Sequence, residues 1–66
     1  MNTCTFEVPI PDWVNWIVQD ADGEWYGWED EPHPVNEVWH CRHGMSTFIA
    51  HGIPPKNWKE EIYTYK

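Results

Sequence analysis

Hydrophobic and polar positions alternate on both sides of a short turn in the first half of the chain. Asp20 opens this turn and Gly23 supplies the left-handed backbone that closes it, as in a common three-residue hairpin loop. The runs on either side are rich in Trp, Val, Ile and Tyr, which favour strands. With Asp20 facing Glu24, an antiparallel hairpin results in which Trp16 lies opposite Trp28.

This register predicts a hairpin with aromatic side chains on both faces. One face carries Val14, Trp16, Val18, Tyr26 and Trp28, and the other carries Trp13, Ile17 and Trp25 among Asn15, Gln19, Gly27 and Glu29. A sheet with one solvated face would alternate apolar and polar residues. Either the rest of the chain covers the second face, or that face binds a partner.

Two further strands are predicted after the hairpin. Pro32 and Pro34 exclude a central strand from the segment that follows it. Residues 38–41 have the composition of a third strand and residues 46–51 that of a fourth, with Gly44 in the turn between them.

The C-terminal residues change character and predict a short helix. Asn57 is a candidate N-cap with Glu60 three residues later, which is a capping box that could start a helix through Tyr63. Three apolar residues recur at helical spacing: Trp58, Ile62 and Tyr65. We therefore expect an α+β, mainly β fold in one small domain, residues 1–66, with a three- or four-stranded antiparallel sheet and a short C-terminal helix.

The chain is short and unusually aromatic. A domain of 66 residues buries only about 60% of its unfolded surface, so a homodimer or an unusually heavy core is expected to add stability. Trp, Tyr and Phe make up 17% of the residues. They are too many for a chain of this size to bury completely, and exposed aromatic clusters indicate a binding partner.

Acidic and basic residues are distributed unevenly along the chain. Residues 1–41 contain nine acidic side chains and no Lys or Arg, and the formal net charge is −7. This balance argues against direct binding to nucleic acid or anionic lipid, which needs clustered Lys and Arg. It suits a partner protein with a basic surface, although the same charge could serve solubility alone.

The sequence lacks the patterns of export and membrane insertion. Its first residues have neither a basic region nor an apolar run of signal length, and no apolar run could span a membrane. The chain is therefore expected in the cytoplasm, with Cys4 and Cys41 as free thiols.

The acidic turn superficially resembles a calcium loop. Matching positions of an EF-hand loop are occupied by Asp20, Asp22, Glu24, Trp28 and Glu31. Position 6 of that loop needs glycine for its sharp turn and is Trp25 here, between flanks that favour strands rather than helices. A structural turn is the better interpretation.

Two motifs suggest a family. The pattern D-W-x-x-W-x-x-Q-D-x-D-G-x-W at residues 12–25, with a closing P-P-x-x-W at residues 54–58, resembles small tryptophan-rich proteins of tailed bacteriophages and prophages. The resemblance covers most of the chain and implies a phage gene acting in the host bacterial cytoplasm. It implies no catalytic residues, because those proteins are functionally uncharacterised.

The cysteine and histidine residues allow a metal site or a catalytic pair, and each has a simpler structural alternative. A structural zinc ion could be held by Cys4, Cys41, His43 and His51, with His33 and His40 nearby. The spacing of these residues matches no standard zinc motif. The alternative to a zinc site is that Cys41 packs in the core and the histidines lie at loop edges. Cys41 and His43 could form a nucleophile pair, but no known catalytic motif surrounds them. We therefore expect no cofactor and no enzymatic activity.

The sequence thus predicts a binding protein that inhibits or redirects a bacterial host or defence protein. The expected partner-binding residues are Trp13, Trp25, Tyr26, Trp28, Glu29, Asp30 and Glu31. The alternative for Trp13 and Trp25 is burial beneath Trp58 and its helix. Other functional hypotheses are a DNA mimic that blocks a nucleic-acid-binding protein and a small zinc-stabilised or carbohydrate-binding module.

Overall fold

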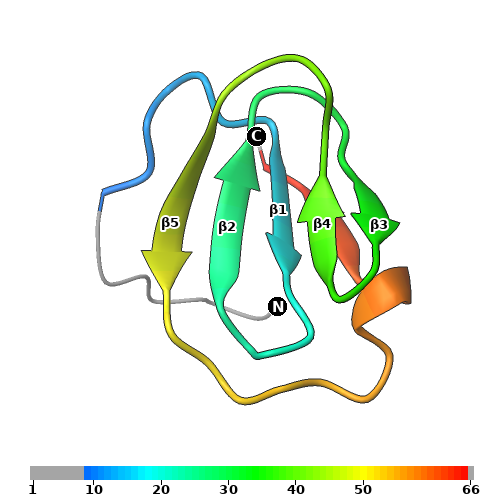
Figure 1. Cartoon of the computed structure of the whole chain (residues 1–66). Helices are drawn as coiled ribbons and strands as arrows, with labels where there is room; N and C mark the ends of the chain where they lie inside the picture. The colour runs from blue at the N-terminus through cyan, green and yellow to red at the C-terminus, as the bar shows by residue number, and fades with distance from the viewer. Residues whose placement is uncertain (1–8, 66) are drawn as a thin grey trace.

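The protein is built from two antiparallel sheets. A computed structural model describes residues 9–65, and Figure 1 shows the arrangement of its strands. The elements are β1 (Trp16–Gln19), β2 (Trp25–Trp28), β3 (His33–Val35), β4 (Val38–His40), β5 (Ser46–Ala50), the 3-10 turn η1 (Trp58–Glu60) and β6 (Ile62–Thr64). The main sheet has the order β5-β2-β1-β6, and β3 pairs with β4 in a separate two-stranded ribbon. The fold is mainly β.

The predicted hairpin is confirmed in its register. Trp16 pairs with Trp28 across β1 and β2. The Asp20 N–H donates to the Glu24 carbonyl at 2.9 Å, and the Gly23 N–H donates to the Asp20 carbonyl at 2.9 Å. Gly23 has a φ of 99°, the left-handed backbone expected of it. The predicted fourth strand is also present, as β5 paired with β2.

The predicted third strand exists but belongs to another sheet. β4 pairs with β3 rather than joining β1 and β2. Pro34 lies inside β3, opposite Trp39. A two-stranded ribbon consists only of edge strands, so a residue without an N–H is tolerated there. The prolines therefore excluded a central strand, as expected, but permitted a short edge strand.

The predicted C-terminal helix is wrong. The Asn57 side chain makes no capping hydrogen bond, the 3-10 turn ends at Glu60, and residues 62–64 form β6 against β1. The free edge of β1 has backbone N–H and C=O groups that need partners. Ile62, Tyr63 and Thr64 favour strands, and pairing with β1 supplies those partners more fully than a second helical turn would.

One face of the main sheet holds a small apolar core. Its buried members are Val14, Ile17, Ile49 and Ala50, with Ile10, Trp13 and Trp25 packed against them. A register shift in the β2–β5 pairing accompanies the burial of two consecutive residues, Ile49 and Ala50.

The predicted facing of Val14 was wrong. A Cβ at Gly27 would lie 2.9 Å from both Val14 Cγ atoms, so Val14 packs on the Gly27 face rather than beside Trp16 and Val18. β1 begins only at Trp16, so the strand alternation does not extend back to Val14.

The ribbon is attached to the opposite face by Trp39. This side chain is only 5% exposed. Its indole N–H donates to the Gln19 carbonyl at 3.0 Å, and its backbone N–H donates to Asp20 Oδ1 at 3.0 Å. Its ring also meets the Trp58 ring edge-on at 6.1 Å. Trp39 thereby joins the ribbon, the end of β1 and the 3-10 turn.

Trp39→Phe tests this anchor. The variant keeps an aromatic ring but removes the donor to the buried Gln19 carbonyl, so we expect the free energy of unfolding, measured by urea denaturation, to fall by about 1–3 kcal/mol. Trp28→Phe is the matched control, because within residues 9–65 the buried Trp28 indole N–H has no hydrogen-bond partner. Equal losses in the two variants would mean that ring volume, and not the hydrogen bond, holds the ribbon.

Candidate functional site

Four aromatic side chains share the face of the main sheet on which the ribbon packs. Strand alternation and register place Trp16, Tyr26, Trp28 and Phe48 on this side, and we call them the aromatic face. All four are half-buried. The Tyr26 and Phe48 rings meet edge-on, 5.9 Å apart.

The ribbon covers only part of this face. Its anchors at Trp39 lie at the end of β1, and Val18 of β1 is completely buried. In Figure 1 the ribbon stands beside β1 and in front of β6, whereas no strand formed by residues 9–65 lies in front of β2 and β5. The aromatic residues of β2 and β5 are half-exposed, in the part of this face over which the described residues form no second layer.

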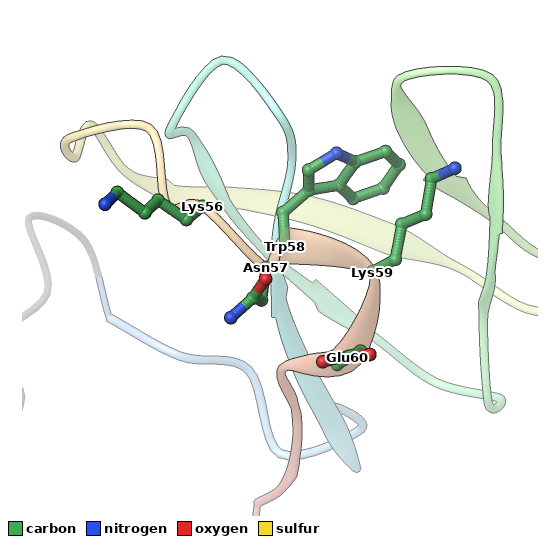
Figure 2. A pocket seen from close by; sticks show the side chains of 5 residues that line it. All are labelled: Lys56, Asn57, Trp58, Lys59 and Glu60. Atoms are coloured by element: carbon green, nitrogen blue, oxygen red, sulfur yellow. The ribbon is translucent and has the colours of Figure 1, made fainter.

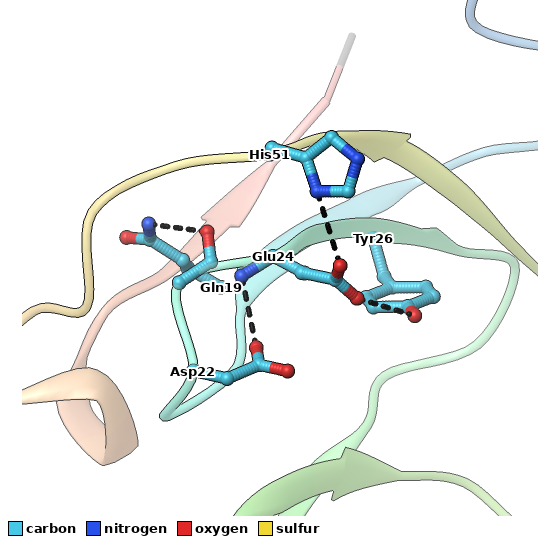
Figure 3. Close-up of polar contacts among 6 residues, drawn as sticks. Gln19, Asp22, Glu24, Tyr26 and His51 are labelled. Carbon is cyan, nitrogen blue, oxygen red and sulfur yellow. Dashed lines mark hydrogen bonds and ion pairs between the residues drawn. The ribbon is translucent and has the colours of Figure 1, made fainter.

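A polar cluster borders the aromatic face at the hairpin turn (Figure 3). Glu24 Oε1 accepts a hydrogen bond from the Tyr26 hydroxyl at 3.3 Å, and Glu24 Oε2 lies 3.1 Å from His51 Nδ1. The His51 ring centroid is 4.9 Å from that of Phe48. Burial raises the pKa of the Tyr26 phenol, and the Glu24 carboxylate raises it further. The phenol therefore stays protonated and acts as a hydrogen-bond donor.

A second acidic segment borders the other end of β2. Glu29 Oε1 accepts the Met45 N–H at 3.1 Å, which ties this segment to the loop before β5. Asp30 and Glu31 are exposed. Gly44, with a φ of 87°, passes so close that a Cβ there would lie 2.9 Å from Asp30 Oδ2. Carboxylates thus lie at both ends of β2, whose aromatic side chains are half-exposed.

The structure divides the predicted partner-binding residues between two faces. Trp13 and Trp25 pack against the core, and the Trp25 ring lies 6.2 Å from that of Tyr63. Tyr26 and Trp28 belong to the aromatic face, with the three acidic residues Glu29, Asp30 and Glu31 following directly in sequence. Trp58, the residue expected to cover Trp13 and Trp25, packs against Trp39 instead.

Three residues of this region were not among the partner-binding residues predicted from the sequence. Trp16 could have been found, because the predicted register placed it opposite Trp28. Phe48 and His51 could not, because their positions depend on the pairing of β5 with β2, which joins segments about 20 residues apart in sequence.

The zinc hypothesis gains no site from the described residues. Within residues 9–65, no three His, Cys, Asp or Glu side chains converge on a point that could hold a metal ion. His51 is paired with Glu24, and Cys41 is a half-buried free thiol. Cys4, the fourth expected ligand, lies outside the described residues.

A shallow hollow lies beside the 3-10 turn. It has a volume of about 220 Å³ and is lined by Lys56, Asn57, Trp58, Lys59 and Glu60. Figure 2 shows these side chains pointing in different directions, and Lys59 Nζ lies 5.8 Å from the centre of the Trp58 ring. The charged groups therefore do not converge on a common point, as an acid and base acting on one substrate would.

Comparisons with known proteins gave no match. No family model, no curated protein and no solved structure matches the chain. Among residues 9–65, no helix is long and apolar enough to cross a membrane.

The carboxyl group of Asp20 lies under the ribbon, close to other acids. Burial raises its pKa, the hydrogen bond from the Trp39 N–H partly lowers it, and the charges of Asp22 and Glu24 raise it further, for a net increase above 3.8. The folded protein thus holds this proton more tightly than the unfolded chain does. The resulting stability is fully present below pH 3.8 and is lost as pH rises through the folded-state pKa.

Asp20→Asn tests this linkage. The amide oxygen can still accept the Trp39 N–H, while the cost of burying a charge disappears, so we expect a higher melting temperature at pH 7 than in the unmodified protein. The difference should shrink as pH falls, in thermal unfolding scans followed by circular dichroism. Asp20→Ala should instead lose about 1–3 kcal/mol at pH 7, since the buried N–H is left without its acceptor. A pH-independent gain in the Asn variant would contradict the linkage.

Proposed function

We propose that this protein is a non-enzymatic binding protein that docks a basic partner protein on the aromatic face. The observation that carries the proposal is the incomplete cover of this face by residues 9–65: Tyr26, Trp28 and Phe48 lie half-exposed where these residues form no second layer over the sheet. Tyr, Trp and Phe are enriched at protein interfaces, because they bury a large area at a low cost in side-chain entropy.

Charge around the aromatic face favours a basic partner. Glu24 borders one end of β2, and Asp30 and Glu31 border the other. The whole chain carries a formal charge of −7. Complementary charge at the rim of an interface speeds encounter and excludes acidic partners, while the apolar centre supplies most of the binding free energy.

The biological setting of the proposal comes from the resemblance of the sequence to tryptophan-rich phage proteins. In that setting the partner is a bacterial host or defence protein in the host cytoplasm, and binding inhibits or redirects it. A DNA mimic would use the same carboxylates as substitutes for phosphates. The two mechanisms differ in what carries the affinity, aromatic contacts in the first case and charge in the second.

A pull-down from bacterial lysate with aromatic and acidic variants separates these mechanisms. Tyr26→Ala and Phe48→Ala should each weaken retention of the partner at least 30-fold at every salt concentration, as expected for central interface residues. Asp30→Asn with Glu31→Gln should weaken retention less than about tenfold, and only at low salt, because exposed rim charges act mainly on the rate of encounter.

Val38→Ala is the control, because Val38 is an exposed apolar residue that lies on the ribbon and not on the aromatic face. Circular dichroism and melting temperature establish that each variant is folded. Retention that depends on the acidic pair and not on Tyr26 or Phe48 would favour DNA mimicry. Equal loss in Val38→Ala would move the interface to the ribbon, and retention unchanged in every variant would refute the proposed face.

A further inference from the structure

The outer surface of the β3–β4 ribbon carries a distinct set of side chains. Side chains alternate between the two sides of a strand, and Trp39 is directed to the main sheet. The residues of opposite parity therefore face away from the sheet: His33, Val35, Val38 and His40. All four are exposed.

His33 and His40 lie directly opposite each other across the two strands. The Cβ atoms of such a cross-strand pair are about 4.5–5.5 Å apart, so both imidazoles project side by side from one surface. A transition metal binds an imidazole nitrogen at about 2.0–2.1 Å. Two imidazoles that leave adjacent positions of a sheet can therefore reach one ion between their tips.

The ribbon holds this pair in place before any ligand arrives. Three successive residue pairs join its strands, and Trp39 fixes it to the end of β1. Pro34, next to His33, has a fixed φ, and Asn36 adopts left-handed backbone with a φ of 55° in the tight connection. Preorganisation lowers the entropy lost when both side chains bind one ion. The net charge of −7 also raises the local concentration of cations.

We propose that His33 and His40 form a two-histidine chelating site for a divalent transition-metal ion of the Ni²⁺, Cu²⁺ or Zn²⁺ class. Imidazole suits these ions, and affinity in the series is highest for Cu²⁺. In the described part of the chain no third His, Cys, Asp or Glu joins the pair. Water or an external ligand completes the coordination. This site is separate from the aromatic face and does not depend on the proposed function.

The set differs from the zinc set considered from the sequence. The earlier set consisted of Cys4, Cys41, His43 and His51, and His33 and His40 were only near it in sequence. His51 is paired with Glu24 at the hairpin turn. The cross-strand register, and not proximity in sequence, brings His33 and His40 together.

Calorimetric titration with nickel chloride tests the site. The untagged full chain is used, with both cysteines replaced by serine so that thiols do not contribute. We expect one Ni²⁺ per chain, with affinity reduced at least tenfold in both His33→Asn and His40→Asn, because a single imidazole cannot chelate.

His43→Asn is the matched control, an exposed histidine in the loop after β4. It should bind Ni²⁺ as tightly as the parent chain. Melting temperatures without metal establish that the variants fold. The three histidine side chains are exposed, so their replacement should change the melting temperature little relative to the cysteine-free parent. In NMR spectra, paramagnetic Ni²⁺ should broaden the His33 and His40 imidazole signals together and before the others. Unchanged affinity in either single variant, or an equal loss in His43→Asn, would overturn the proposal.

Discussion

The end of β1 is the point on which the rest of the structure depends. Gln19 and Asp20 are buried polar residues, 7% and 8% exposed. The Gln19 amide donates to the Gly23 and Ile53 carbonyls, at 2.7 and 3.0 Å, and so joins the hairpin turn to the chain after β5. The Gln19 carbonyl and Asp20 carboxyl accept both N–H groups of Trp39. Because buried polar groups are costly when unpaired, these contacts position the turn, the ribbon and the C-terminal segment together.

This junction also determines which surfaces stay open. The core occupies one face of the main sheet, around Ile17 and Ile49, and the ribbon covers the β1 side of the other. In the described part of the chain, β2 and β5 carry aromatic side chains on a surface without a second layer, and the outer side of the ribbon carries His33 and His40. A short chain buries a smaller fraction of its surface than a long one. Residues 9–65 accordingly leave two candidate binding surfaces partly exposed.

Stability is compromised close to the aromatic face. Asp20 is buried near Asp22 and Glu24, which disfavours its ionised form. In residues 9–65, the Trp28 indole N–H is buried without a hydrogen-bond partner. Neither arrangement improves folding, since unpaired donors and crowded carboxylates cost free energy. Such local costs cluster where a surface meets requirements other than stability. Here they lie at opposite ends of the hairpin, Asp20 at its turn and Trp28 at its open end.

The sequence by itself determined the hairpin, its turn and its register, because contacts between residues a few positions apart depend on local backbone preferences and strand alternation. Gly23 and the Trp16–Trp28 pair are examples. Only the tertiary structure decided that residues 62–64 form a strand rather than a helix, since the partner they satisfy is the distant edge of β1. The same holds for the separation of β4 into a ribbon and for the meeting of Tyr26 with Phe48 and of His33 with His40. The hydrogen-bonding needs of strand edges and the burial of Trp39 select these pairings, and neither can be evaluated until the segments are placed in space.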